Sequence, residues 1–468
     1  MEYALIIDGK RQVTGESSEV RNPSTGELVA RMPNAQPQDL ENAIAAAKRA
    51  FATWSLKPDE ERRAACHAMA NKIEAHAEEL AQLLTAEQGK PLNGLGSRFE
   101  LGGTVAWTRA TADLQLKAEV IQDSPEGRIE LHRKPIGVVG SITPWNWPVL
   151  IASWHIIPAV RTGNTVVIKP SPYTPLSTLR LVELINEVLP PGVVNAITGP
   201  DSLGAALSSH PAIGKMVFTG STATGRKVMA SAATTLKRLT LELGGNDAAI
   251  VLDDVNPQEI APKLFFAAMV NSGQVCLAAK RVYVPEKIYD AVCAELAKIA
   301  EGAAVGNGLD EGVMFGPVQN RMQFEKVQAI IEDARAQGKV IAGGKPHQGK
   351  GFFIHPTVVS GLPDSARLVC EEQFGPVMPV LKYSSLDEVI ERANASEYGL
   401  GGTVWSASTE RAVEVAKRLN TGTVWINKHL DLPPTIPYGG TKQSGFGVEL
   451  GQQGLEEFTQ LKVINIAK

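Results

Sequence analysis

The sequence predicts an α/β fold in which parallel strands are covered by helices on both faces. Between residues 137 and 252, short apolar or β-branched segments alternate with segments of helical periodicity. This alternation is typical of βαβ units. The chain also has 468 residues with average hydrophobic and charged fractions of 44% and 21%, which favours a globular protein of two or three domains.

The elements are predicted in order along the chain. Residues 37–115 are expected to be helical. Helices are placed at 39–53 and at 62–84, the second following the proline-led start at Pro58. Short alternating stretches over residues 119–137 predict an exposed hairpin. Strands are then expected at 137–142, 165–169, 193–198, 215–219 and 239–242, with helices at 149–160, 176–188, 202–209 and 224–233. Ligands of such sheets lie beyond the carboxyl ends of the strands, so chemistry is expected at residues 144–147, 169–171, 220–222 and 242–245.

Composition argues against several classes of function. A formal net charge of −4 does not fit a nucleic-acid binder, and no apolar run approaches the ~18–20 residues of a membrane span. The first residues lack the basic and apolar regions of a signal peptide. The four cysteines are too few and too dispersed for a disulfide framework, and no histidines have metal-ligand spacing. We therefore expect a cytoplasmic enzyme without a metal, without a nucleic-acid or membrane partner, and with free thiols.

Common nucleotide-binding motifs are missing. Each Gly-x-Gly lacks its third glycine, and no P-loop motif occurs. The remaining phosphate candidate is the segment from Gly220 to Gly225, where a predicted strand opens a helix. The free N–H groups and positive dipole end of such a helix suit a pyrophosphate, although glycine–serine turns also cap ordinary helices.

Cys276 differs from the other cysteines in its setting. Gly273 would let the backbone approach a ligand closely, and Lys280 and Arg281 would lower the pKa of a nearby thiol. The alternative is a small buried core residue. The other three cysteines lie in amphipathic helical segments (Cys66, Cys293) or beside two glutamates (Cys370).

Seven short motifs occur along the chain. They are Pro144-Trp145-Asn146-Trp147-Pro148, Lys169-Pro170-Ser171, Phe218-Thr219-Gly220-Ser221-Thr222, Leu241-Glu242-Leu243-Gly244-Gly245-Asn246, Gly273-Gln274-Val275-Cys276, Glu372-Gln373-Phe374-Gly375-Pro376-Val377 and Pro437-Tyr438-Gly439-Gly440. In order and approximate spacing they resemble the motifs of the NAD(P)-dependent aldehyde dehydrogenase superfamily, along nearly the whole chain. The resemblance implies a Rossmann-type cofactor-binding domain (1–116 and 137–243), an α/β catalytic domain (244–442) and a small β oligomerisation arm (117–136 and 443–468).

The resemblance also implies catalytic roles. Cys276 would attack the aldehyde carbonyl and form a thiohemiacetal, and the Asn146 amide with the Cys276 N–H would stabilise its oxyanion. Glu242 would activate the water that hydrolyses the thioester left by hydride transfer. Without the resemblance, Asn146 would be a turn residue and Glu242 a solvated carboxylate at a strand end.

The implied cofactor is NAD or NADP. Its contacts would come from Lys169 to the adenosine ribose, from Glu372 to the nicotinamide ribose, and from Trp145, Gly220, Ser221, Gly225 and Phe374 around the remaining groups. NAD-preferring relatives commonly place a Glu three residues after the lysine, but Pro172 stands there. No carboxylate would then repel a 2′-phosphate, so we expect use of both cofactors.

The substrate side is expected to be apolar. Trp147, Ile151 and Trp154 share one face at helical spacing, and Val275 and Leu277 flank the thiol. These residues favour a broad range of apolar or aromatic aldehydes, with plain core packing as the alternative. Relatives that oxidise carboxylate-bearing semialdehydes have an arginine where Trp154 stands, which argues against that substrate. Amino- or betaine-type aldehydes stay open because tryptophan can face a cation.

Two alternative functions fit the same fold. A CoA-acylating semialdehyde dehydrogenase would typically lack the carboxylate at Glu242. A non-catalytic structural or binding protein would not need Cys276 and Glu242 in intact motifs. In every case an exposed hairpin and an apolar terminal strand at 461–466 favour a homodimer or homotetramer, because free sheet edges tend to pair.

Overall fold

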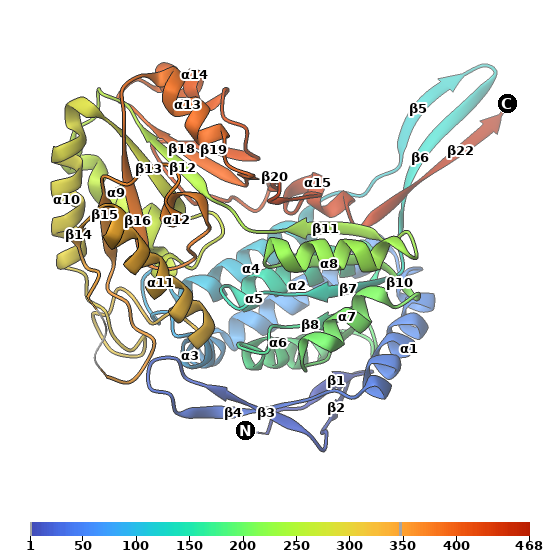
Figure 1. Ribbon diagram of the computed structural model, residues 1–468. Helices are drawn as coiled ribbons and strands as arrows, with labels where there is room; N and C mark the ends of the chain where they lie inside the picture. The colour runs from blue at the N-terminus through green and yellow to red at the C-terminus, as the bar shows by residue number, and fades with distance from the viewer. Residues whose placement is uncertain (1, 346–348) are drawn as a thin grey trace.

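The computed structural model describes residues 2–345 and 349–468. Two sheets, each covered by helices, lie side by side, and a long arm projects from the first of them (Figure 1). The predicted α/β class is therefore confirmed. The described helices include none with the length and apolarity that a membrane span requires.

The first sheet has eight strands in the order β2-β1-β9-β8-β7-β10-β11-β21. Its five central strands are parallel: β7 (Val138–Ile142), β8 (Thr165–Lys169), β9 (Val194–Ala196), β10 (Ile213–Thr219) and β11 (Arg238–Glu242). Antiparallel strands β1 (Leu5–Ile7), β2 (Lys10–Gln12) and β21 (Gly445–Phe446) form the edges. The chain order reverses between β7 and β10, and this switch point is where such sheets bind ligands.

Helices of the first unit agree with the predicted segments, with one exception. The connecting helices are α5 (Pro148–Arg161), α6 (Leu176–Asn186), α7 (Asp201–Ser209) and α8 (Thr222–Ala233), and the N-terminal segment supplies α1 (Pro37–Trp54) and α4 (Ser97–Asp113). The single helix expected at 62–84 is wrong, because the chain forms α2 (Asp59–Ala75) and α3 (Ala77–Gln88) with a break at His76. A second acidic first turn follows His76, and negative charges favour a new helix N-terminus.

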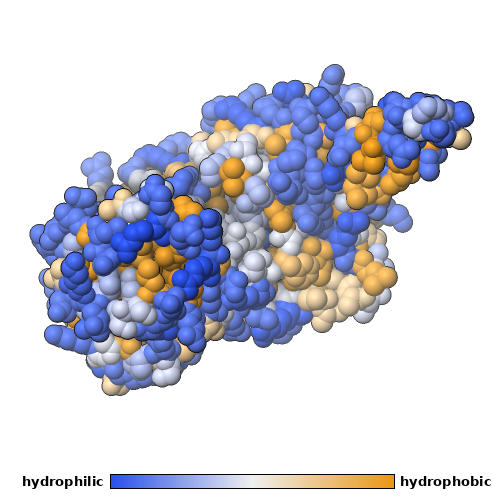
Figure 2. Space-filling model, turned by 90° about the horizontal axis from the view of Figure 1, so that it is seen from above, coloured by the Kyte–Doolittle hydropathy of each residue, from blue (hydrophilic) through white to orange (hydrophobic). Residues whose placement is uncertain are grey.

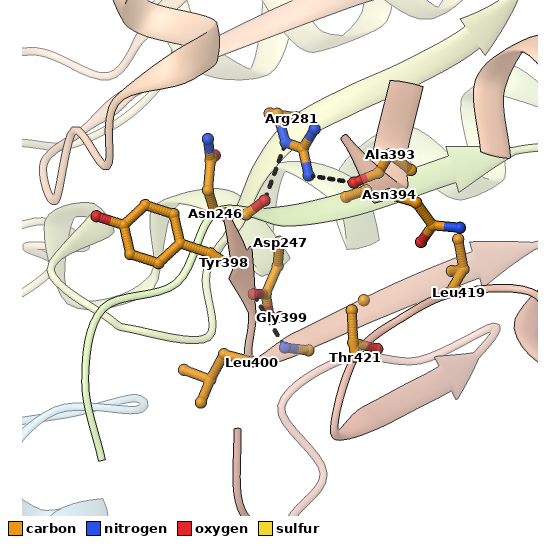
Figure 3. A pocket seen from close by; sticks show the side chains of 13 residues that line it. Asn246, Asp247, Arg281, Ala393, Asn394, Tyr398, Gly399, Leu400, Leu419 and Thr421 are labelled. Atoms are coloured by element: carbon orange, nitrogen blue, oxygen red, sulfur yellow. Dashed lines mark hydrogen bonds between the residues drawn. The ribbon is translucent and has the colours of Figure 1, made fainter. Parts of the chain in front are cut away.

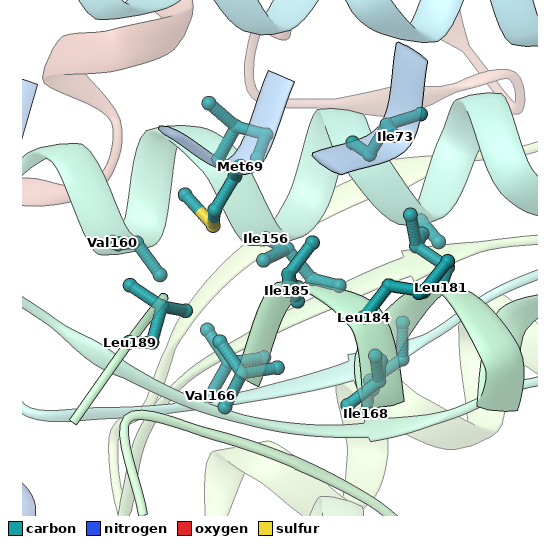
Figure 4. Close-up of a cluster of buried hydrophobic side chains, with 14 of the residues drawn as sticks. Met69, Ile73, Ile156, Val160, Val166, Ile168, Leu181, Leu184, Ile185 and Leu189 are labelled. Atoms are coloured by element: carbon teal, nitrogen blue, oxygen red, sulfur yellow. The ribbon is translucent and has the colours of Figure 1, made fainter. Parts of the chain in front are cut away.

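A large apolar core joins α2, α5 and α6 to strand β8 (Figure 4). Its labelled members are Met69, Ile73, Ile156, Val160, Val166, Ile168, Leu181, Leu184, Ile185 and Leu189. Full burial of each such side chain stabilises the fold by about 1.5–3 kcal/mol. This packing fixes the carboxyl ends of β7 and β8, from which candidate site residues extend.

The second sheet has the order β14-β15-β16-β13-β12-β18-β19. Its strands are β12 (Asp247–Val251), β13 (Ala279–Pro285), β14 (Lys339–Ala342), β15 (Thr357–Ser360), β16 (Val377–Tyr383), β18 (Gly401–Trp405) and β19 (Thr423–Ile426). All pairings are parallel except that of β14 with β15. One apolar cluster contains α9 (Pro257–Met269) and α10 (Tyr289–Glu301), and another contains α11 (Arg321–Gln337), α13 (Leu386–Asn394) and α14 (Thr409–Ala416).

The arm is a three-stranded antiparallel sheet. The hairpin β5 (Glu119–Ser124) and β6 (Gly127–Pro135) is completed by β22 (Thr459–Ala467), which pairs with β6. Apolar side chains gather on the arm (Figure 2), and the exposed ones are Val120, Ile121, Leu461, Val463 and Ile466. Within the segment 443–468, β21 instead pairs with β11 and α15 (Gly451–Glu456) contacts α5. We therefore propose that the C-terminal part of the arm begins near Thr459.

Shorter elements complete the described chain. They are β3 (Ser17–Arg21) with β4 (Leu28–Pro33), β17 (Tyr398–Gly399) with β20 (Thr441–Lys442), the 3-10 turns η1 (Val270–Gly273) and η2 (Glu286–Ile288), and the short helix α12 (Arg367–Cys370).

Candidate active site

The predicted catalytic residues meet where the first sheet faces the loop that precedes β13. Asn146 follows strand β7, and its Nδ2 donates a hydrogen bond to the carbonyl oxygen of Gln274 at 2.9 Å. The Sγ of Cys276 lies 3.9 Å from the Tyr438 hydroxyl oxygen. The same hydroxyl interacts with Glu242, the last residue of β11. Residues far apart in the chain thus form one cluster.

A strained turn presents Cys276. Asn271, Ser272 and Gly273 have φ values of 52°, 54° and 70°, and left-handed backbone is costly for residues with a Cβ. A Cβ on Gly273 would lie 2.2 Å from the carbonyl oxygen of Gly375. The turn therefore packs directly against the loop that carries Phe374.

The two cations beside Cys276 behave differently. Lys280 Nζ donates hydrogen bonds to the carbonyl oxygens of Val275 at 2.7 Å and Cys276 at 2.5 Å. Arg281 instead donates to the carbonyl oxygens of Asn246 and Ala393, beside a separate small pocket (Figure 3). Burial raises the pKa of the Cys276 thiol to about 12, although Lys280 opposes the rise. Lys280 thus lowers the pKa of the thiol as expected, Arg281 is not among the causes of its shift, and desolvation outweighs the effect of Lys280.

Glu242 is a buried carboxylate that interacts with the hydroxyl of Tyr438. Its side chain is only 2% exposed, and neither oxygen has a hydrogen-bond partner of good geometry among the described residues. Burial, followed by the nearby carboxylate of Glu449, raises the pKa of Glu242 well above its usual value, while the Tyr438 hydroxyl opposes the rise. A buried acceptor without a partner is costly, so the oxygens are available to a water or a substrate.

Sequence patterns missed Glu449, whose carboxylate lies near Glu242, and its buried partner His155. Glu449 is 2% exposed, and its Oε1 lies 3.1 Å from Nε2 of the fully buried His155. His155 also contacts the hydroxyls of Ser141 at 2.8 Å and Thr219 at 3.1 Å. No local signal marks these residues, because Glu449 and His155 are separated by almost 300 positions.

The predicted cofactor residues surround the switch point between β7 and β10. Lys169 ends β8 and is 3% exposed, and its ammonium has no hydrogen-bond or ion-pair partner within the described residues. Burial lowers the pKa of Lys169 to about 8, and Asp201 opposes this effect. Gly220 follows β10, and Ser221 Oγ caps α8 by accepting the Thr224 N–H at 3.3 Å, with Gly225 in the first turn.

The residues predicted to face the nicotinamide are two aromatic rings and a carboxylate. The rings of Trp145 and Phe374 meet edge to face with centroids 5.3 Å apart. Glu372 Oε1 accepts the Gly245 N–H at 3.0 Å and lies 3.5 Å from Lys280 Nζ. A Cβ on Gly244 would lie 2.5 Å from Glu372 Oε2, so a side chain there would displace this carboxylate. The unpartnered ammonium, the helix N-terminus and this carboxylate fit a dinucleotide.

The side of the site predicted to face the substrate is aromatic. The ring of Trp154 is tilted against that of Trp107 and meets that of Tyr438 edge to face, with ring centroids 6.2 Å apart in both pairs. These residues join Cys276 in one apolar cluster whose other members include Trp147, Val275, Leu277, Leu430 and Leu432. Ile151 is buried but lies outside this cluster. Trp107, on α4, was missed because nothing in its local sequence connects it with the motif around Asn146.

Comparisons with known proteins agree with this geometry. The model of the aldehyde dehydrogenase family matches residues 11–464. The chain is 38% identical to betaine aldehyde dehydrogenase of Beta vulgaris, and the match covers 98% of this chain and 95% of the relative. It is also 38% identical to phenylacetaldehyde dehydrogenase of Pseudomonas fluorescens, where the match covers 100% of this chain and 96% of the relative. The structure of an aldehyde dehydrogenase from Bacillus cereus in complex with NAD+ superimposes with a TM-score of 0.97, at 38% identity over 100% of this chain and 97% of that chain.

Motif order, sheet topology and similarity over the full chain lead to one assignment. The protein belongs to the aldehyde dehydrogenase family and is an NAD(P)-dependent aldehyde dehydrogenase.

Proposed function

We propose that this enzyme oxidises apolar or aromatic aldehydes to carboxylates through a thioester on Cys276. The observation that carries the proposal is the buried carboxylate of Glu242, which interacts with the same Tyr438 hydroxyl that contacts the Cys276 sulfur. Cys276 and Glu242 interact electrostatically, and a nucleophile with a base nearby is what hydrolysis of a covalent intermediate requires.

The reaction starts at the thiol. The Cys276 sulfur, after its proton passes to solvent, forms a bond to the carbonyl carbon, and the carbonyl electron pair moves to the oxygen. One hydrogen of Asn146 Nδ2 is bound to Gln274, which leaves the second hydrogen and the Cys276 N–H for this oxyanion. When bound, NAD(P)+ accepts a hydride from the former carbonyl carbon, and the oxygen electron pair re-forms the carbonyl as a thioester.

Hydrolysis completes the cycle. Glu242 takes a proton from a water, whose oxygen adds to the thioester carbon. Collapse of this second tetrahedral intermediate releases the carboxylic acid and returns the electron pair to the Cys276 sulfur. Because burial raises the pKa of Glu242, it holds the abstracted proton well, but it must first be ionised to act as the base.

The cofactor would be held by Lys169 and the start of α8 at the adenosine diphosphate end, and by Glu372, Phe374 and Trp145 at the nicotinamide end. Pro172 provides no carboxylate against a 2′-phosphate, so we propose that NAD and NADP both serve. A preference for NAD beyond a hundredfold in kcat/KM would contradict dual use.

The substrate class is supported by the aromatic cluster. Trp107, Trp154 and Tyr438 lie close together in the cluster that contains Cys276, and such an aromatic lining suits an aryl or alkyl aldehyde. The same rings could face a quaternary ammonium. A panel of phenylacetaldehyde, hexanal, betaine aldehyde and succinate semialdehyde, each assayed with both cofactors, ranks these classes. We expect the first two to give the highest kcat/KM.

Two variants test the mechanism. Cys276→Ala should abolish aldehyde-dependent reduction of NAD(P)+. Glu242→Gln should give a burst of one NAD(P)H per site followed by slow turnover, because the thioester forms but is not hydrolysed. Acceleration of wild-type turnover by CoA with formation of acyl-CoA would favour the CoA-acylating alternative, and full activity of Cys276→Ala would refute the assigned nucleophile.

We also propose that the arm mediates self-association as a homodimer or homotetramer. Its apolar residues Leu461 and Val463 are 60% and 61% exposed, and within residues 2–345 and 349–468 no strand pairs with the outer edges of β5 and β22. Leu461→Ser/Val463→Ser should lower the molar mass measured by light scattering. A cytoplasmic location remains a prediction from the sequence.

A further inference from the structure

A buried ion pair lies directly behind the Asn146 loop. The side chains of Lys90 and Glu100 are both fully buried, and Lys90 Nζ donates a hydrogen bond to Glu100 Oε2 at 2.6 Å. Taking two charges out of water costs several kcal/mol per ion. The attraction within the pair offsets this cost only when the remaining donors and acceptors also find partners. The groups that serve as those partners therefore indicate what the ion pair holds in place.

The ammonium of Lys90 makes its other contacts with Asn146, which is predicted to stabilise the oxyanion, and with Trp147. The ammonium donates to the main-chain carbonyl oxygen of Asn146 at 2.6 Å and lies 3.6 Å from the ring centroid of Trp147. Asn271, from the strained turn before Cys276, donates to the same Asn146 oxygen at 3.1 Å. The Asn146 peptide is thus held by Lys90 on one side and by the nucleophile loop on the other.

The remaining Glu100 contacts are with helix α5. Its Oε1 accepts the N–H groups of Val149 at 2.9 Å and Leu150 at 3.0 Å. These are the first free donors of α5 after Pro148, and the helix has no side-chain cap and no acidic residue of its own in the first turn. Glu100 therefore anchors the start of the helix that carries Trp154, immediately after Asn146.

We propose that Lys90 and Glu100 are positioning residues for the oxyanion step, fixing the Asn146 amide and the first turn of α5 against the reacting carbonyl. This inference rests on the proposed function. Neither residue touches the substrate. Lys90 acts through the Asn146 carbonyl and Glu100 through the α5 N–H groups, so loss of either lets the amide move while Cys276 stays in place. A misplacement of 1 Å costs about a hundredfold in rate.

The experiment compares Lys90→Met with a matched buried lysine. Lys215, also fully buried, donates to the Thr240 hydroxyl at 2.7 Å and pairs with Glu457 at 3.6 Å, away from Asn146. Single-turnover hydride transfer at saturating NAD+ and aldehyde should fall about tenfold to a hundredfold in Lys90→Met and stay within about twofold of wild type in Lys215→Met. Alkylation of Cys276 by iodoacetamide, which forms no oxyanion, should be unchanged in Lys90→Met.

The double variant Lys90→Met/Glu100→Gln separates positioning from stability. It leaves neither charge unpaired, and the glutamine oxygen can still accept the α5 N–H groups. Its unfolding temperature should recover toward the wild-type value, but hydride transfer should stay slow because Asn146 still lacks its donor. If Lys90→Met fails to fold, the double variant alone decides the test.

Two results would overturn the positioning role. One is a hydride-transfer rate in Lys90→Met equal to that of the wild type. The other is a double variant in which both the rate and the unfolding temperature recover. If the wild-type protein reduced no cofactor with any aldehyde, the proposed function itself would fail, and the two failures are thus distinguishable.

Discussion

Gly273→Ala tests how tightly the nucleophile loop is packed against the cofactor loop. The added Cβ would lie 2.2 Å from the Gly375 carbonyl oxygen, where Cβ contacts essentially never fall below 3.0 Å, so the two backbones must separate by about 0.8 Å. The atoms that the Cβ would meet belong to the backbone of Gly375 and Pro376, so no flexible side chain can move aside. One loop carries Cys276 three residues later, and the other carries Phe374.

The expected cost has two parts. A left-handed φ of +70° costs an alanine about 1–2 kcal/mol, and overpacking costs about 1–3 kcal/mol more. The total destabilisation should therefore be about 2–5 kcal/mol. A shift of this size at the sulfur should lower the single-turnover hydride-transfer rate by about a hundredfold.

Gly361→Ala is the matched control. Gly361 has a φ of +71° and no atom within 4 Å of its would-be Cβ, so this variant bears the backbone cost without the overlap. It should lose about 1–2 kcal/mol and keep wild-type activity. Urea unfolding and stopped-flow absorbance of NADH measure both effects. Equal stability losses in the two variants, with activity retained in both, would refute the reasoning.

Three further changes probe charge. Glu449→Gln should move the acidic limb of the pH–rate profile for thioester hydrolysis to lower pH, because Glu449 raises the pKa of Glu242 and the base acts in its ionised form; an unmoved limb would contradict this. Pro172→Glu should lower kcat/KM with NADP at least about tenfold relative to NAD, because a carboxylate repels the 2′-phosphate; a parallel change for both cofactors would contradict it. Glu87, which caps α6, has its pKa raised by burial to about 7, so the folded chain binds this proton more tightly than the unfolded chain. Stability should fall by about 3 kcal/mol between pH ~4.5 and ~7, and urea midpoints across this range should show less of that fall in Glu87→Gln.

Local patterns were sufficient for most of the first sheet. Strand β8 lies at Thr165–Lys169 as predicted, because a β-branched run between turn residues has few other ways to be buried. The joint placement of Asn146, Glu242 and Cys276 was also predictable, although only through the spacing of seven motifs. Their roles remain proposals for experiment.

Pairings between distant charged residues were not predictable. Lys90, Glu100 and Glu449 would each be assigned to the surface from sequence, since charged side chains are rarely fully buried, yet each is almost fully buried here. Only the packing of α3, α4 and α5 shows that Lys90 and Glu100 pair, and that the Asn146 carbonyl and the α5 N–H groups complete their contacts.

The sequence by itself determined the fold class, the motif order and the identity of the reactive thiol candidate. The tertiary structure decided the electrostatics around that thiol. Lys280 and Arg281 are consecutive residues of β13, so their side chains point to opposite faces of the sheet, and only Lys280 reaches the Cys276 loop. A sequence gives the sign of a side chain's charge. The strand sets where that side chain points, and the surrounding packing sets how deeply it is buried.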